Sequence, residues 1–275
     1  MMDEPDEWFD DISWNFNDTN DITISLTYYG QVDKLIHHCE FFSGMTDWLK
    51  NHITVQFIND ASPDQGIFED ICHAYKHRFK LKSYTIKQDI GFNNHGCRNL
   101  AMLQSETHWN WLIDIDVFFT EELLQAMTST HLENNQFYVF KVRFDHYDNP
   151  EDYELFDEKK LLKWVAHPNV WLINKPCFWS TGGYDMEFAG MRHGDKEFFQ
   201  AIDKKKYEHF LFHPLLEEEY DIHVQMPNRT KSYLNQITEH VGHLQKCVDF
   251  VKKRNDNKER KHKKRLLCFD WQRNV

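Results

Sequence analysis

Two aspartates, Asp114 and Asp116, follow directly on the apolar run Trp109–Ile113. A short apolar run bounded by polar residues is typical of a buried central strand, and residues two apart on an extended backbone point the same way. Carboxylates at the end of such a strand are costly unless something compensates them, and their hard oxygens suit Mg²⁺ or Mn²⁺ bridging the protein to a diphosphate. The spacing also fits a solvated turn that caps a helix starting at Glu121, so both interpretations stay open.

Two further polar segments lie upstream. Asn59-Asp60 ends an alternating, β-branched stretch, where a carboxylate can accept a hydrogen bond from a nucleobase or ribose, or an Asx turn can begin a loop. Gly91–Asn99 has glycines, which allow close backbone approach, and leads into the start of a helix, which favours anions. Arg98 in this segment can reach a diphosphate or pair with the carboxylates of a metal site, or can lie on a helix surface.

A fourth segment comes later in the chain. Trp179–Asp185 holds a Gly-Gly turn between aromatic residues, and Asp195 follows about ten positions on, at the start of an amphipathic helix. An aspartate at that place can serve as a general base. The same residue can also be an ordinary N-cap, bonding the backbone of Phe198.

Strands and helices alternate along the first half of the chain, which favours a mostly parallel, doubly wound α/β sheet with helices on both faces. Ligands bind such sheets at the carboxyl ends of the strands, where Asp60 and Asp114 fall. The expected strands span 22–27, 53–58, 84–86, 109–113 and 137–144. The expected helices span 32–42, 68–79, 97–104 and 121–127. We expect an acidic arm at 1–20, a catalytic body at 21–230, and a C-terminal helix with a basic tail at 231–275.

Composition fits a folded protein. The chain of 275 residues is 41% hydrophobic and 15% aromatic, enough for a sizeable core. The sequence has no apolar stretch of about 18–20 residues that could span a membrane. The acidic start is unlike a secretory signal. The six dispersed cysteines lack metal-ligand spacing. We therefore predict a cytoplasmic protein with reduced thiols.

The net charge of −12 is unevenly distributed. Segment 251–265 carries nine basic and two acidic residues, so the remaining chain is strongly acidic. An acidic body does not indicate a general nucleic-acid-binding protein. The basic segment can be a solvated helix end, or can contact a phosphate-rich or membrane surface, which would make the protein peripheral at a membrane.

Together, the four segments resemble glycosyltransferase family 2 and its relatives, over roughly residues 21–205. The resemblance lies in their order: Thr27-Tyr28-Tyr29, Asn59–Asp64, Gly91–Asn99, the Asp114–Asp116 motif and Gly182–Asp185 with an acidic residue about ten positions on. It implies a GT-A fold, a metal-dependent transferase and a nucleotide-diphospho-sugar donor, most often a UDP-sugar.

The resemblance also implies residue roles. Asp60 would contact the base with Thr27 and Tyr29 nearby, and Arg98 would lie near the diphosphate and ribose. Asp114 would lie by the ribose. The remaining implied roles are a metal ligand at Asp116, the catalytic base of an inverting enzyme at Asp195, and an acceptor surface at Trp179 and Gly183.

The sequence departs from the family pattern in two places. Asn59 stands where the first aspartate of the turn is usual, which should matter little if Asp60 makes the base contact. Gly194 replaces the glutamate of a Glu-Asp pair, so the base assignment rests on Asp195, with Glu197 as a substitute. A later histidine often completes metal coordination in the family, and we prefer His223 to His213.

Two other function classes remain as alternatives. A nucleotidyltransferase should carry a glycine-rich, basic phosphate loop after the first strand, which Thr27–Gln31 lacks. An inactive sugar-binding protein would tolerate loss of the carboxylates, which are present here. For a transferase, the expected acceptor is a glycan or other surface polymer, with modified bases of DNA as the alternative.

Overall fold

A computed structural model describes residues 20–90, 93–145, 165–189, 194–211, 223–225, 267 and 269–275. Residues 1–19 of the expected N-terminal arm, residues 231–266 of the expected C-terminal helix and basic tail, and His213 lie outside the described residues. The division of the chain into arm, body and tail therefore stays a prediction.

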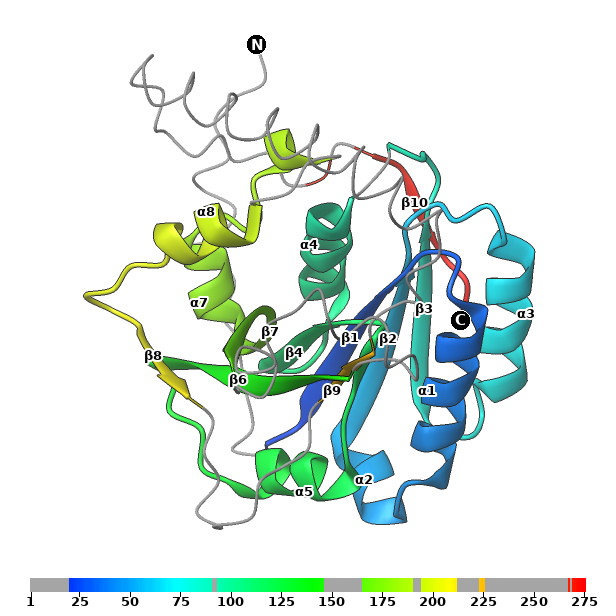
Figure 1. Ribbon diagram of the computed structural model, residues 1–275, viewed down its shortest axis with the longest axis horizontal. Helices are drawn as coiled ribbons and strands as arrows, with labels where there is room; N and C mark the ends of the chain where they lie inside the picture. Colours follow the sequence, from blue (N-terminus) through cyan, green and yellow to red (C-terminus); the bar gives the residue numbers. More distant parts are fainter. Residues whose placement is uncertain are drawn as a thin grey trace, which may run out of the picture.

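The described strands form a ten-stranded sheet, in which four neighbouring strands, β3-β2-β1-β4, are parallel (Figure 1). The strands follow the order β10-β3-β2-β1-β4-β7-β6-β9-β5, with β8 paired to β6. The parallel part comprises β1 (Ile22–Tyr28), β2 (Ile53–Asn59), β3 (Lys80–Ile86) and β4 (Trp109–Asp114). Parallel strands of this kind are buried on both faces, and nearly every residue of β1 and β4 is buried.

Helices cover both faces of the sheet, as expected. The helices are α1 (Val32–Gly44), α2 (Asp47–His52), α3 (Gln65–Tyr75), α4 (Asn94–Gln104), α5 (Glu121–Ser129), α7 (Lys175–Ser180) and α8 (Gly194–Ala201). On one face α1, α3 and α5 pack on a core that includes Leu26 and Phe57. On the other, α4, α7 and α8 pack on two cores around residues such as Leu112 and Ile58. Each strand alternates its side chains between the two layers.

In the second half of the sheet, the sequence predicted only one of the strands. The strand β6 (Gln136–Asp145) matches the expected strand at 137–144. The strand β7 (Val165–Asn174) pairs antiparallel with both β4 and β6. Short strands complete this side: β5 (Val117–Phe118), β8 (Glu208–Leu211) and β9 (His223–Gln225).

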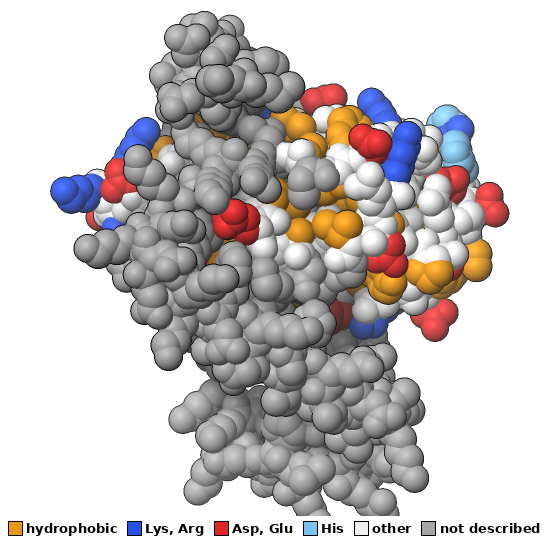
Figure 2. Space-filling model, turned by 90° about the horizontal axis from the view of Figure 1, so that it is seen from above, with side chains coloured by type: hydrophobic (Ala, Val, Ile, Leu, Met, Phe, Trp, Pro, Cys, Tyr) orange, Lys and Arg blue, Asp and Glu red, His pale blue; other side chains and the backbone are white. Residues whose placement is uncertain are grey.

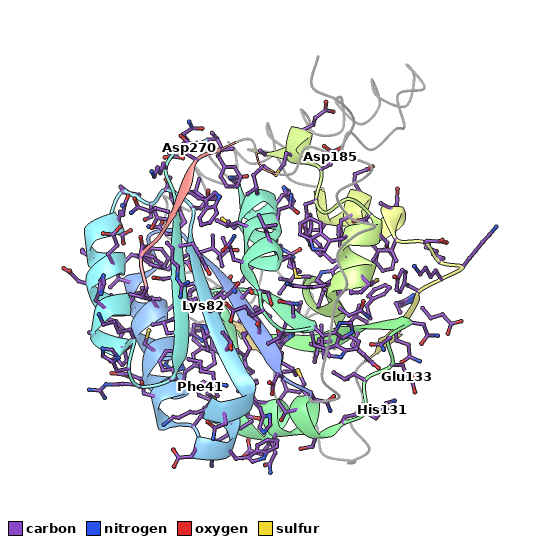
Figure 3. All side chains as sticks on the ribbon, turned by 180° about the vertical axis from the view of Figure 1, so that it is seen from behind. Phe41, Lys82, His131, Glu133, Asp185 and Asp270 are labelled. Carbon is purple, nitrogen blue, oxygen red and sulfur yellow. The ribbon has the colours of Figure 1, made fainter. Side chains whose placement is uncertain are left out.

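The end of the chain belongs to the sheet. The strand β10 (Trp271–Arg273) pairs antiparallel with β3. Phe269, just before this strand, is buried in the core that includes Ile58. Figure 3 shows Asp270, at the start of this segment, at the same end of the molecule as Asp185, with His131 toward the other end. The C-terminal residues thus cover the β3 edge.

Candidate active site at the carboxyl edge of the sheet

The carboxyl ends of three neighbouring strands bring the first polar segments together. In the strand registers, Tyr28 lies beside Asn59 and Thr27 beside Asp114. The helix α4 starts above these ends, so its first turn faces the same edge. Figure 2 looks down on this edge, where hydrophobic and acidic side chains of the described residues lie next to one another.

Arg98 is the centre of a buried polar network. Its side chain is 2% exposed. Nη2 donates to Oδ1 of Asp114 at 3.0 Å and to the carbonyl of Asn169 at 2.8 Å. Nη1 donates to the Tyr184 hydroxyl at 2.9 Å and lies 3.4 Å from Oδ1 of Asp195. One guanidinium therefore links the end of β4 to α8, and it lies beneath the carboxylates instead of on a helix surface.

The two aspartates of the Asp114–Asp116 motif differ in their surroundings. Besides Arg98, Asp114 accepts hydrogen bonds from the side-chain amides of Asn94 at 2.9 Å and Asn169 at 3.1 Å. Its carboxylate is thus already compensated by the protein. Burial, followed by repulsion from Asp114, raises the pKa of Asp116 to about 6, against a smaller opposing effect of Lys34. A cation at this carboxylate would offset the repulsion from Asp114 and favour the ionised form.

The turn that carries Asp116 is held from α1. The buried His38 ring donates from Nε2 to the carbonyl of Ile115 at 3.0 Å and stacks on Phe118. Burial lowers the pKa of His38 to about 3, so this donor is a neutral imidazole. The side chain that caps α5 is Thr120, which accepts from the backbone of Leu123. The interpretation of this motif as a helix cap is therefore wrong.

The suggested second metal ligand, His223, belongs to β9. This strand pairs with β5, and the register places His223 opposite Phe118, two residues after Asp116. The backbone of His223 is thus near the motif, while its side chain is not described. Among the described side chains, no group of three or more His, Cys, Asp or Glu residues could hold a metal ion.

Asp60 is almost completely buried, and only one of its two carboxylate oxygens accepts a hydrogen bond from the described residues. Its Oδ2 accepts the backbone N–H of Asn93 at 2.9 Å, whereas Oδ1 has no partner among the described residues. Burial raises its pKa to about 6. The neighbouring Asn59 accepts the backbone N–H of Ser62 at 2.8 Å, so the Asx-turn function falls to Asn59. Because Asn59 makes the turn, Oδ1 of Asp60 is left as a hydrogen-bond acceptor for a ligand.

Thr27 and Tyr29, at the carboxyl end of β1 near Asp60, have different surroundings. Thr27 donates to the side-chain oxygen of Asn94 at 2.8 Å, which joins β1 to the Asp114 network. Tyr29 is 46% exposed, and its hydroxyl donates to Asp89 at 3.4 Å. Of the two, Tyr29 offers an accessible aromatic ring at this edge.

Asp195 is the second residue of α8 and faces Arg98 and His95. Burial would raise the pKa of its carboxyl, but the interaction with His95 and the charge of Arg98 outweigh burial and leave the pKa below its usual value. The aspartate is therefore held ionised, as an acceptor of protons must be. At 18% exposure its carboxylate still reaches the surface of the site.

The Gly-Gly turn is fastened to α4. Asn99 accepts from the backbone N–H of Tyr184 at 2.8 Å and donates to its carbonyl at 2.9 Å. Gly183 has a φ of +78°, and a Cβ there would lie 2.7 Å from Asn99 and 2.9 Å from the half-buried Trp179 ring. Both the positive φ and the lack of space for a side chain therefore require glycine, and the Trp179 ring occupies the space beside it.

The sequence did not identify several members of the network. Asn94, His95 and Asn99 stand in the quoted Gly91–Asn99 segment, where the pattern Asn-Asn-His was a usable signal. Tyr184 stands in the Gly-Gly segment. Asn169 gave no signal, because its strand β7 was not predicted.

Comparison with known proteins gives structural matches only. No family model and no curated protein sequence matches this chain. TarS (residues 1–349) from S. aureus superimposes with a TM-score of 0.55 at 13% identity, covering 74% of this chain and 60% of that one. The mannosyltransferase PcManGT from Pyrobaculum calidifontis, solved with GDP-Man and Mn²⁺, gives 0.54 at 13% identity, covering 78% and 61%.

A third match, GalNAc-T7 solved with UDP, GalNAc and Mn²⁺, gives a TM-score of 0.55 at 10% identity, covering 78% of this chain and 45% of that one. The chain thus spans about three fifths or less of the length of these proteins. Their shared architecture is the GT-A fold, and the expected fold is confirmed. In the described part of the chain, no helix is long and apolar enough to cross a membrane.

Proposed function

We propose that this GT-A chain is a glycosyltransferase that moves a sugar from a nucleotide-diphospho-sugar, in the first place a UDP-sugar, to an acceptor hydroxyl. The observation that carries the proposal is the network around Arg98. It joins a compensated carboxylate at the end of β4 to an ionised carboxylate on α8, at the strand ends where α/β sheets bind ligands. The structural neighbours solved with GDP-Man or with UDP support the donor class.

Asp60 and Tyr29 would hold the base. The unpartnered Oδ1 of Asp60 is a buried acceptor, and such an atom is costly unless a ligand donates to it. A uracil ring carries one N–H donor on its pairing edge, which fits this acceptor. The exposed ring of Tyr29 can stack on the base, and Thr27 holds the neighbouring strand end through Asn94.

Asp114 would contact the ribose, and Asp116 with His223 would ligate Mn²⁺ or Mg²⁺. Asp116 fits a metal because its causes of raised pKa are burial and a like charge, which a cation offsets. When bound, the cation supplies positive charge that stabilises a leaving diphosphate. Arg98 is too buried for the main contact with a diphosphate, so we assign it the positioning of Asp114 and Asp195.

Asp195 would take the proton from the acceptor hydroxyl, which then attacks the anomeric carbon with inversion. Trp179 and Gly183 would present a face for the acceptor. We propose a glycan or other surface polymer as the acceptor, with modified DNA bases as the alternative, and a cytoplasmic location with peripheral membrane contact through the basic segment.

The test is a screen of nucleotide sugars with Mn²⁺, measuring release of the free nucleoside diphosphate. We expect release from a UDP-sugar by the wild-type chain and by the control Asp70→Asn, whose side chain is exposed on α3. We expect loss with Asp195→Asn. Release of pyrophosphate from a nucleoside triphosphate and a sugar phosphate would instead indicate a nucleotidyltransferase. Binding without release from any donor would indicate an inactive sugar-binding protein.

A further inference from the structure

His95 is a buried side chain next to the Asp195 carboxylate. It is completely buried in the first turn of α4, and its ring stacks on Tyr184 with 5.3 Å between the ring centroids. Its Nε2 lies 3.8 Å from Oδ2 of Asp195. Buried polar side chains usually interact with another polar group, and the polar group next to His95 is the proposed base Asp195.

The structure makes room for this ring at Gly194. A Cβ at Gly194 would lie 2.4 to 2.7 Å from three atoms of the His95 imidazole. Any other residue at 194 would therefore displace the ring. The glycine that departs from the family pattern is thus explained by the histidine that fills its side-chain space.

Asp195 is held from two sides by one helix. His95 approaches Oδ2, while Nη1 of Arg98 lies 3.4 Å from Oδ1. Residues three apart on a helix project from the same face, so α4 presents both groups to the two carboxylate oxygens. Polar groups that face both oxygens restrict the rotation of a carboxylate more than a group on one oxygen alone.

We propose that His95 is a positioning residue for Asp195, which it holds in the orientation needed to receive the acceptor proton. The proposal rests on the function proposed above. Nε2 of His95 faces Oδ2 of Asp195 at 3.8 Å, and in this proposal that nitrogen carries the proton. Among the described residues, the groups that face Asp195 are His95 and Arg98 from α4 and Tyr184 from the Gly-Gly turn, with Asp114 on the far side of the guanidinium.

The test compares His95→Leu, which removes the donor, with His95→Gln, whose side-chain amide can replace it. We expect His95→Leu to lower kcat at least about tenfold while the dissociation constant of UDP changes less than about twofold, because only orientation is lost. His95→Gln should recover most of kcat. His95→Met serves as the apolar variant if the leucine protein does not fold.

A second readout does not need turnover. We follow the Asp195 carboxyl titration by ¹³C NMR, assigned with Asp195→Asn, and expect its midpoint to rise in His95→Leu and to stay near wild type in His95→Gln. The proposal is overturned if the apolar variant keeps wild-type kcat, or if both variants lose activity alike and the titration does not move. If the wild-type chain releases no nucleoside diphosphate at all, the proposed function fails, and the titration still decides whether His95 interacts with the Asp195 carboxylate.

Discussion

Arg98 and Asp114 form a buried ion pair in which Nη2 lies 3.0 Å from Oδ1. The same guanidinium lies within 3.4 Å of Asp195. Because its planar fork points to groups on four elements, it fixes β4, β7, α8 and the Gly-Gly turn relative to one another. This pair is the structural basis of the site, and it leads to the first prediction.

Arg98→Met should destabilise the fold and abolish transfer. Removing the buried guanidinium takes the positive charge away from both Asp114 and Asp195, which costs on the order of 3 kcal/mol. Arg98→Lys should lose less stability than Arg98→Met but more than the control, because one ammonium group cannot replace the several donors of a guanidinium. Urea unfolding at pH 7 measures the loss, with Arg78→Met, at an exposed position after α3, as the control. Equal stability of the Arg98 and Arg78 variants would contradict this assignment.

The second prediction concerns pH and Asp60. Its folded pKa of about 6 exceeds the unfolded value of 3.8. Between these values the folded state binds more protons, so the free energy of unfolding should fall as the pH rises from about 4 to about 6. A shift of this size corresponds to about 3 kcal/mol.

The isosteric variant Asp60→Asn isolates this effect from that of Asp116, which has a raised pKa of its own. The asparagine oxygen can still accept from Asn93, and no charge is buried. We expect the stability of the variant, measured by urea unfolding at several pH values, to depend less on pH than that of wild type. Parallel curves for the two proteins would show that Asp60 is not the group responsible.

The sequence predicted the parallel half of the sheet well because each strand there is buried on both faces and ends in a polar turn. β1 and β4 were predicted to within a residue at each end. The strand β3 begins at Lys80, earlier than expected, because the exposed Lys80 and the half-buried Lys82 broke the apolar pattern. Pairing with Thr54 and Gln56 of β2, a tertiary effect, makes those two residues part of the strand.

The candidate site was predicted less completely. Aspartates at strand ends are visible in a sequence, whereas partners that come from other elements are not. Asn169 reaches Asp114 from β7, and His38 reaches the Ile115 carbonyl from α1. Neither residue stands in a motif, since contacts across the sheet depend on strand order and not on spacing along the chain.

The third prediction concerns Asp116 and the metal. Mn²⁺ should bind wild type in the presence of UDP, and Asp116→Asn should weaken that binding at least about tenfold because a hard charged ligand is replaced by an amide. Electron paramagnetic resonance of free Mn²⁺ measures binding directly, without turnover. Asp70→Asn is the control. Unchanged Mn²⁺ affinity in Asp116→Asn would remove this residue from the metal site.

The fourth prediction concerns the C-terminal strand. Phe269 is buried against the start of α4, where a Cβ on Gly96 would lie 2.5 Å from its ring. Phe269→Ala should therefore cost about 3 kcal/mol of stability, measured by urea unfolding, with Gln272→Ala in β10 as a milder control. An effect no larger than that of the control would mean that the segment does not support the core. Tests of the basic segment should accordingly neutralise charges within 252–265 and leave 267–275 in place.

The last prediction is a double-mutant cycle between Gly194 and His95. Gly194→Ala should destabilise the fold by about 1–3 kcal/mol, because its Cβ would lie 2.4 Å from Nε2 of His95. In the His95→Ala background the added methyl group meets empty space, so the same change should cost much less. Urea unfolding of the four proteins gives the coupling free energy, which we expect to exceed about 1 kcal/mol for residues in direct contact. Additive effects would show that the two positions do not share this space, and the explanation for the glycine at 194 would then be wrong.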